Sequence, residues 1–215
     1  MNSVPPRTVL FDLDGTLADT VPLIVASYQH ALPQVLGWRP TREQCTEWIG
    51  RTLVDTFTAL APDRVDELTA CYLDWNLANH DAYVRPFPGV TELVDALGES
   101  GRGFGVVTSK RLRSAQVSLD CVGLTGRIPL LATEEDTAAH KPSPDPLRHA
   151  LHRLGAEAAD AVYVGDAVVD LQAARAAGMR SIAVTWGAGD ETQLRAAGPT
   201  AVVQDVAELR AVLGL

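Results

Sequence analysis

Short apolar runs rich in valine and isoleucine recur along the chain, and amphipathic patterns with a helical period lie between most of them. Runs of this kind are typical of buried strands. They predict strands at residues 8–11, 103–107, 128–131, 161–164, 181–184 and 201–203. Leu93, Val94 and Leu97 fall on one face of a predicted helix at residues 91–99. Strands that alternate with helices predict an α/β fold, with a parallel sheet that carries helices on both faces.

One long interval interrupts this alternation. Residues 19–85 contain no good strand pattern, and helical patterns cover residues 21–32, 41–48, 53–60 and 65–79. An interval of this length is too long for a simple crossover connection. We therefore expect an all-helical cap domain at residues 16–88, inserted into a core made of residues 1–15 and 89–215. Such a cap could close over a substrate and exclude water, although a purely structural helical bundle would show the same pattern.

The composition narrows the possible partners and the cellular location. A chain of 215 residues with 47% hydrophobic content can bury a substantial core. Its formal charge of −9 argues against a nucleic-acid partner, which requires a basic surface. No signal peptide or membrane-spanning pattern is present, so we expect a cytoplasmic protein without a membrane partner. The cysteines, Cys45, Cys71 and Cys121, lack any metal-binding spacing and are expected to be reduced thiols.

The two lysines are unusual in this composition. Lys110 and Lys141 are the only lysines among 18 basic residues. If an acidic protein binds a phosphate, the binding site needs local positive charge. A divalent cation and one or two fixed basic residues can supply it. The two positions therefore either require a compact ammonium group or are what remains in a composition biased toward arginine.

Two aspartates mark the end of the first predicted strand. Asp12 and Asp14 lie two residues apart, directly before Gly15. Alternate residues of a strand project to the same side, so both side chains can converge on one metal and one phosphate. The first acid could attack phosphorus, and the second could carry a proton to the leaving group. The same pattern also occurs in structural turns and calcium sites.

The other predicted strand ends carry matching chemistry. Thr108 and Ser109 follow the second strand, Lys141 lies beyond the third, and Asp166 and Asp170 follow the fourth. In open α/β sheets, ligands bind beyond the carboxyl ends of the strands. Hydroxyl groups can hold phosphate oxygens, a lysine can neutralise developing charge, and Asp166 can complete a metal site. Because the proposed ligands are few and all are oxygens, the expected metal is Mg²⁺.

In this combination the motifs resemble those of the haloacid dehalogenase superfamily, specifically its magnesium-dependent phosphatases with a helical cap after the first motif. The resemblance covers essentially the whole chain and implies a Rossmann-like catalytic core. It implies that Asp12 is the nucleophile, which forms an aspartyl-phosphate. Asp14 would be the general acid and then the base that activates water. Thr108 would bind the transferring phosphoryl group, and Lys141 would stabilise its charge.

The resemblance also implies the metal ligands. They would be the Asp12 carboxylate, the Asp14 backbone carbonyl and Asp166, with Asp170 in support through water or through Lys141. Family members often have asparagine in place of Ser109, and threonine or serine in place of Ala167. These two departures remove no residue assigned to chemistry, but they could loosen contacts around the site.

The second acid separates the reaction classes within the superfamily. Dehalogenases lack an acid at the position of Asp14, and phosphonoacetaldehyde hydrolases use a cap lysine, which residues 16–85 do not contain. A phosphohydrolase is therefore expected, with a β-phosphoglucomutase-like phosphomutase as the alternative that shares the same core. A non-enzyme alternative is a receiver-like phosphoacceptor module. The helical insertion and the proton carrier Asp14 argue against it.

One segment of the predicted cap bears on the substrate. Residues 48–53 and the Asp-Thr-Phe at 55–57 resemble the substrate loop of phosphoglycolate phosphatases and of a related bacterial pyrophosphatase. Gly50 would let this loop approach the substrate, and Arg51 either contacts a second anionic group or is a solvated surface residue. We expect a small phosphorylated substrate, pyrophosphate or 2-phosphoglycolate, and a monomer or small homo-oligomer. The predicted substrate-binding residues are Gly15, Ser109, Gly50 and Arg51.

Overall fold

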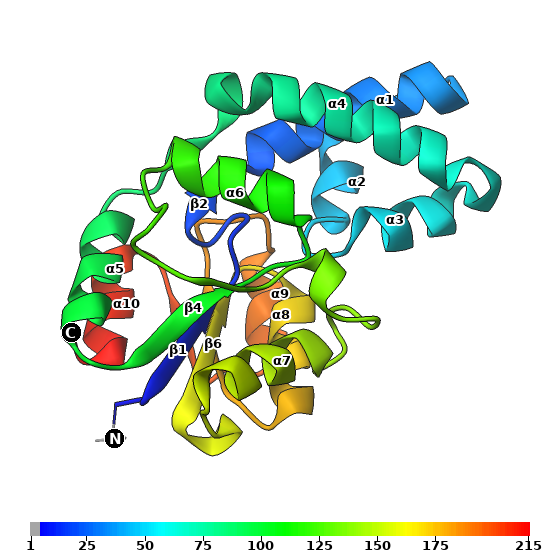
Figure 1. Cartoon of the computed structure of the whole chain (residues 1–215). Helices are drawn as coiled ribbons and strands as arrows, with labels where there is room; N and C mark the ends of the chain where they lie inside the picture. Colours follow the sequence, from blue (N-terminus) through cyan, green and yellow to red (C-terminus); the bar gives the residue numbers. More distant parts are fainter. Residues whose placement is uncertain (1–4) are drawn as a thin grey trace.

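A six-stranded sheet forms the centre of the molecule, as seen in a computed structural model that describes residues 5–215. The strand order is β5-β4-β1-β6-β7-β8, and every neighbouring pair in this sheet is parallel (Figure 1). The bounds are β1 Thr8–Phe11, β4 Gly103–Val107, β5 Leu130–Ala132, β6 Ala161–Gly165, β7 Arg180–Val184 and β8 Ala201–Val203. Because β1 lies between β4 and β6, the loops that follow these three strands meet at one edge of the sheet.

Helices cover both faces of the sheet. They are α5 Val90–Glu99, α6 Leu112–Cys121, α7 Asp145–Leu154, α8 Val168–Ala177, α9 Glu191–Ala196 and α10 Val206–Leu213, with short 3₁₀ turns at Glu134–Asp136 and Ala158–Asp160. Successive residues of β1 point to opposite faces. Val9 and Phe11 belong to one buried cluster with α5 and α10, and Leu10 belongs to another with α7 and α8. This arrangement confirms the predicted α/β fold.

A helical layer lies over the carboxyl ends of the strands (Figure 1). It comprises α1 Val21–Leu36, α2 Arg42–Glu47, α3 Leu53–Leu60, a 3₁₀ turn at Pro62–Arg64, and α4 Val65–Tyr83. A two-stranded antiparallel ribbon of β2 Ala18–Asp19 and β3 Arg85–Pro86 joins this layer to the sheet. The helices α1 to α4, called the cap below, bury their own cluster, which includes Tyr28, Phe57 and Tyr72. The domain boundaries near residues 16 and 88 stay a prediction.

The structure shifts one strand relative to its predicted position. The third strand was expected at residues 128–131 and is observed at Leu130–Ala132. Pro129 has no N–H group to donate, so the regular pairing begins after it. Ile128 is instead buried in the cluster that contains Val9. The apolar pattern also does not predict α6, α9 and α10. In residues 5–215 no helix has both the length and the apolar character needed to cross a bilayer.

Candidate active site

Asp12 lies at the end of β1 and is only 2% exposed. Its N–H group donates to the Val164 carbonyl at 2.9 Å, which anchors the residue to β6. The Asp12 Oδ1 atom lies 3.0 Å from the Lys141 ammonium, but no hydrogen bond of good geometry reaches it among the described residues. Burial raises the pKa of Asp12 well above its ordinary value, and the charges of nearby aspartates add to this rise against the opposing effect of Lys141. A buried carboxylate oxygen of this kind is open to a further partner.

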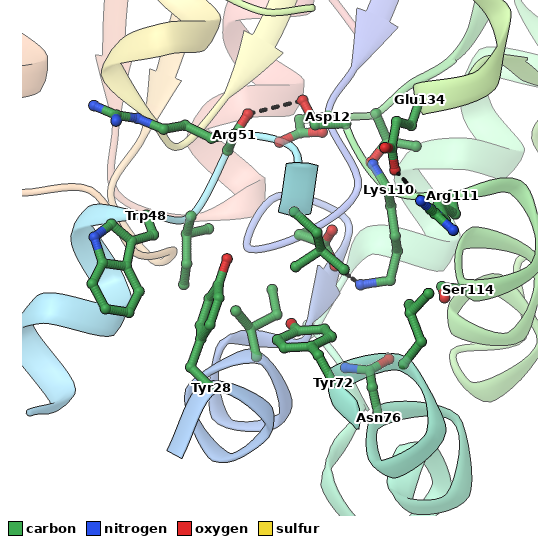
Figure 2. A pocket seen from close by; sticks show the side chains of 18 residues that line it. Asp12, Tyr28, Trp48, Arg51, Tyr72, Asn76, Lys110, Arg111, Ser114 and Glu134 are labelled. Atoms are coloured by element: carbon green, nitrogen blue, oxygen red, sulfur yellow. Dashed lines mark hydrogen bonds and ion pairs between the residues drawn. The ribbon is translucent and has the colours of Figure 1, made fainter. Parts of the chain in front are cut away.

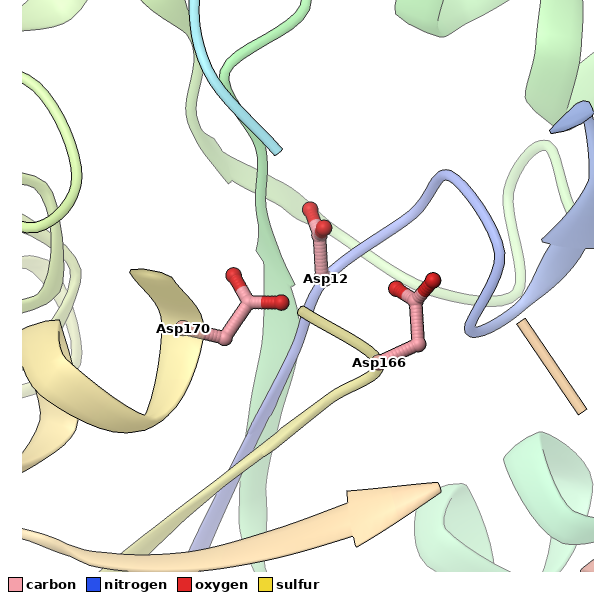
Figure 3. A group of neighbouring side chains, drawn as sticks. All are labelled: Asp12, Asp166 and Asp170. Carbon is pink, nitrogen blue, oxygen red and sulfur yellow. The ribbon is translucent and has the colours of Figure 1, made fainter. Parts of the chain in front are cut away.

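Three buried carboxylates form a compact cluster. One oxygen from each of Asp12, Asp166 and Asp170 lies within 4.8 Å of the others (Figure 3). Burial and the charge of Asp170 raise the pKa of Asp166 to about 7, against the opposing effects of its hydrogen bonds and of Lys141. Lys141 supplies one positive charge against three negative ones. The remaining negative charge and the all-oxygen donor set fit a divalent cation.

Asp166 follows β6 and is held by contacts from two other loops. Thr16 Oγ1 donates to Asp166 Oδ1 at 3.1 Å, and the Ala188 N–H group donates to Asp166 Oδ2 at 2.7 Å. Gly15 has a φ of +73°, and a Cβ atom at this position would lie 2.2 Å from Asp166 Oδ2. A glycine is therefore required where the loop after β1 passes the carboxylate. Gly15, which is expected from the sequence to bind substrate, lies next to the Asp166 carboxylate of the acid cluster.

Lys141 is buried at the centre of a polar network. Its ammonium lies 2.7 Å from Asp170 Oδ1, 3.0 Å from Asp12 Oδ1 and 3.1 Å from the Tyr163 hydroxyl. Burial by itself would lower the pKa of Lys141, but the charges of Asp12 and Asp170 outweigh this effect and raise it well above the ordinary value. The second oxygen of Asp170 accepts from the Ala167 N–H group at 3.0 Å. Asp170 and Asp12 thus share the Lys141 ammonium.

Asp14 points to the other lysine of the chain. Its Oδ1 atom accepts from the Lys110 ammonium at 2.8 Å and from Thr20 Oγ1 at 2.6 Å. Burial by itself would raise the pKa of Asp14, but the Lys110 charge and these two hydrogen bonds lower it below its ordinary value. Each of the two lysines therefore pairs with one member of the Asp12–Asp14 pair. The Asp14 carboxylate is not part of the acid cluster. The resemblance implies only the backbone carbonyl of Asp14 as a metal ligand.

The loop after β4 connects the sheet to the cap. Thr108 is buried, and its hydroxyl accepts from the Lys110 N–H group at 3.2 Å. Ser109 Oγ donates to the Gly50 carbonyl at 2.8 Å. Gly50 has a φ of +92°, and a Cβ atom there would approach Val169 Cγ2 to 2.8 Å. The loop around Gly50 can therefore come this close only because the residue is a glycine.

A pocket lies between the sheet and the cap. Six of the predicted site residues line this pocket: Asp12, Asp14, Gly50, Arg51, Thr108 and Ser109. Three others do not line it: Lys141, Asp166 and Asp170. Its cap side carries the aromatic side chains of Tyr28, Trp48 and Tyr72 (Figure 2). Arg51 is exposed, and Figure 2 shows its guanidinium group directed away from the other labelled side chains.

Several contacts at the site were not expected from the sequence. Thr16 and Thr20 hold Asp166 and Asp14, and the Tyr163 hydroxyl both accepts from Lys141 and donates to the Val107 carbonyl at 2.8 Å. A tyrosine inside the otherwise aliphatic strand β6 is a usable signal, because a buried hydroxyl needs a polar partner. The two threonines carry no comparable signal, since small hydroxyl residues after a turn are common.

The comparisons assign this arrangement to a class of enzyme. A family described as haloacid dehalogenase-like hydrolase matches residues 9–184. The chain belongs to this family, which confirms the predicted resemblance and makes it a hydrolase. The family match gives no support to the receiver-like alternative.

Individual relatives share nearly the full length of the chain. The pyrophosphatase PpaX of Bacillus pumilus is 35% identical over 214 residues, which covers 100% of this chain and 99% of that protein. A crystal structure of a hydrolase from Pseudomonas syringae has a TM-score of 0.88 at 25% identity and covers 96% of this chain and 97% of its own. A predicted phosphoglycolate phosphatase from Haemophilus somnus has a TM-score of 0.84 at 24% identity, with coverage of 96% and 97%, and supports the fold.

Proposed function

We propose that the chain is a Mg²⁺-dependent phosphohydrolase that forms an aspartyl-phosphate on Asp12. Its substrate would be a small phosphorylated metabolite, either pyrophosphate or 2-phosphoglycolate. The observation that carries this proposal is the buried Asp12 Oδ1 atom, which lies 3.0 Å from the Lys141 ammonium and lacks a hydrogen bond among the residues described. A carboxylate held in this way beside a pocket is suited to attack phosphorus.

In the first half-reaction, an Asp12 oxygen forms a bond to phosphorus while the bond from phosphorus to the leaving oxygen breaks. Thr108 borders the pocket and can donate its hydroxyl proton to a phosphoryl oxygen. The Lys141 ammonium, which its two aspartate partners keep protonated, stabilises negative charge beside Asp12. Asp14 gives a proton to the leaving oxygen, and this step requires Asp14 to be protonated and free to reach that oxygen.

In the second half-reaction, Asp14 takes a proton from a water molecule. The water oxygen forms a bond to phosphorus, the bond from phosphorus to Asp12 breaks, and inorganic phosphate leaves. The proton count balances, because Asp14 loses one proton in the first half and regains one in the second. The cap over the pocket limits the access of other water molecules during this cycle.

The acid cluster is the proposed site for Mg²⁺. Asp12, Asp166 and the Asp14 backbone carbonyl would hold the ion, and Asp170 would position Lys141. When bound, the ion supplies charge neutralisation for the phosphoryl oxygens and for the clustered carboxylates. The support for this proposal is the excess of buried negative charge and the raised pKa of Asp166.

The pocket beside Asp12 is narrow. Its cavity volume is about 50 Å³, whereas a single bound water needs roughly 10–15 Å³. The name of the B. pumilus relative supports pyrophosphate, and the resemblance of the loop at residues 48–53 supports 2-phosphoglycolate as well.

The test is a phosphate-release assay with and without Mg²⁺ on pyrophosphate, 2-phosphoglycolate and β-glucose 1-phosphate, compared by kcat/KM. We expect Mg²⁺-dependent release from one of the first two substrates to exceed release from the sugar phosphate. Conversion of the sugar phosphate to its isomer without net phosphate release would instead identify a phosphomutase. A cytoplasmic location and a monomeric or small homo-oligomeric state stay predictions.

A further inference from the structure

The ion pair between Lys110 and Asp14 is largely shielded from solvent. The two side chains are 9% and 13% exposed, and their closest atoms, Lys110 Nζ and Asp14 Oδ1, lie 2.8 Å apart. Within residues 5–215, Asp14 supplies the only carboxylate that pairs with this ammonium. Figure 2 shows the Lys110 side chain extending toward Tyr72 and Asn76 of the cap. The ammonium therefore lies inside the pocket and depends on one partner.

This contact conflicts with the proton transfer proposed for Asp14. The Oδ1 atom is held by both Lys110 and Thr20, so this oxygen can act on the leaving oxygen only if both contacts break. Its departure would leave the Lys110 ammonium shielded and unpaired, which is costly. A second anion in the pocket would remove this cost by taking the place of Asp14.

The other cations of the pocket are less suited to meet such an anion. Three basic residues line it, Arg51, Lys110 and Arg111. Arg51 is directed away from the other labelled residues in Figure 2. Arg111 Nε lies 3.2 Å from Glu134 Oε2 and is already paired. Lys110 is the cation whose present partner is the proposed proton carrier, Asp14.

We infer that Lys110 is a specificity-determining residue, whose ammonium passes from Asp14 to a second anionic group of the substrate and so releases Asp14 for proton transfer. The substrates selected would carry a phosphate or carboxylate next to the phosphoryl group that is transferred. The inference rests on the proposed function and explains why the position holds a compact ammonium group in a chain otherwise rich in arginine.

The test compares a substrate that has a second anionic group with one that lacks it. Pyrophosphate has such a group, whereas 4-nitrophenyl phosphate does not and has a leaving group that needs no proton. For Lys110→Met we expect kcat/KM for pyrophosphate to fall about 100-fold, with a raised KM, because a charged contact to the substrate is lost. For 4-nitrophenyl phosphate we expect a change of less than about threefold. A parallel loss on both substrates would overturn the inference.

Two further variants separate this role from general effects of charge or folding. Arg113→Met removes one positive charge from an exposed position in the first turn of α6, three residues after Lys110, and should leave the ratio of the two kcat/KM values unchanged. An equal loss of pyrophosphate activity in Arg113→Met would also overturn the inference.

Lys110→Gln can still donate a hydrogen bond to Asp14, and it provides a milder substitution should Lys110→Met fold poorly. It should reproduce the substrate-selective loss, and retention of full pyrophosphate activity would contradict the role.

The wild-type enzyme distinguishes this inference from the proposed function. Failure to hydrolyse either pyrophosphate or 2-phosphoglycolate, while 4-nitrophenyl phosphate is hydrolysed, would remove the proposed substrates and this inference with them. Hydrolysis of both pyrophosphate and 4-nitrophenyl phosphate, followed by an equal loss in Lys110→Met, would remove only the role of Lys110.

Discussion

The Lys141 ammonium lies 3.0 Å from Asp12 Oδ1, and both side chains are buried. The same ammonium is shared with Asp170 at 2.7 Å. Lys141 therefore has a second anionic partner if the charge of Asp12 is removed. This relationship makes it possible to test the proposed nucleophile without destroying the site around it.

We expect Asp12→Asn to abolish Mg²⁺-dependent phosphate release, with kcat reduced at least about 1,000-fold, because the attacking carboxylate is lost. The protein should remain folded, since asparagine has nearly the same size and Lys141 keeps Asp170. Phosphate release and thermal unfolding followed by circular dichroism measure the two effects. Normal turnover by the variant would refute the assignment of the nucleophile.

Asp14→Ala should show a loss that depends on the leaving group. With ordinary substrates we expect a reduction of about 100-fold to 10,000-fold, the range that general acid–base catalysis contributes. With a good leaving group, the phospho-enzyme should still form, because Asp12 is intact. Acid-quenched labelling of the enzyme measures this intermediate, and rapid turnover of ordinary substrates would contradict the role of Asp14.

The stability of the metal-free protein should depend on pH through Asp166. Its pKa rises from 3.8 in the unfolded chain to about 7 in the fold, so the folded state binds more protons between these values. The stabilising contribution of protonated Asp166 is therefore present below about pH 4 and is lost as the pH rises through about 7. We expect the metal-free protein to have a higher Tm at pH 5.5 than at pH 8.

Mg²⁺ and an Asp166→Asn variant serve as controls for this pH effect. The cation should stabilise the ionised cluster and so raise Tm more at pH 8 than at pH 5.5. Asp166→Asn should reduce the difference in Tm between the two pH values without metal. An unchanged difference in the variant would show that other groups cause it.

Gly50→Ala should lower kcat/KM, because the added Cβ would press against Val169 at the contact between the cap loop and the sheet. Gly37 provides a matched control. It also has a positive φ, +76°, but an added Cβ there would meet nothing within 4 Å. Both variants should lose about 1–2 kcal/mol of stability from backbone strain. Only Gly50→Ala should also impair activity, and equal activity of the two variants would contradict the importance of this contact.

Arg51→Ala should change kcat/KM for pyrophosphate and for 4-nitrophenyl phosphate by less than about threefold, as expected for an exposed surface substitution. The reason is the exposed position of Arg51 and the direction of its guanidinium group in Figure 2. Steady-state kinetics on both substrates measure the effect. A raised KM for pyrophosphate alone would show that Arg51 contacts the second anionic group, the other role considered for it from the sequence.

Much of the fold and of the site could be predicted from local patterns. The strand at Thr8–Phe11 was predicted with its observed bounds, because a short run of apolar residues ends there at a polar turn. The acids Asp12 and Asp166 could be placed at one edge, because the carboxyl ends of parallel strands meet. The shift of the third strand was not predicted, since it depends on how Pro129 and Ile128 fit between neighbouring elements.

The sequence by itself determined the α/β fold, the acid pair and the two lysines as candidate charges, because these follow from composition, strand periodicity and motif order. Only the tertiary structure decided that Lys141 pairs with Asp12 and Lys110 with Asp14. It also decided that Gly15 packs against Asp166 and that Arg51 is exposed. The physical reason is that such contacts join residues far apart in the chain or depend on side-chain direction, and both are set only when β1, β4, β6 and the cap pack together.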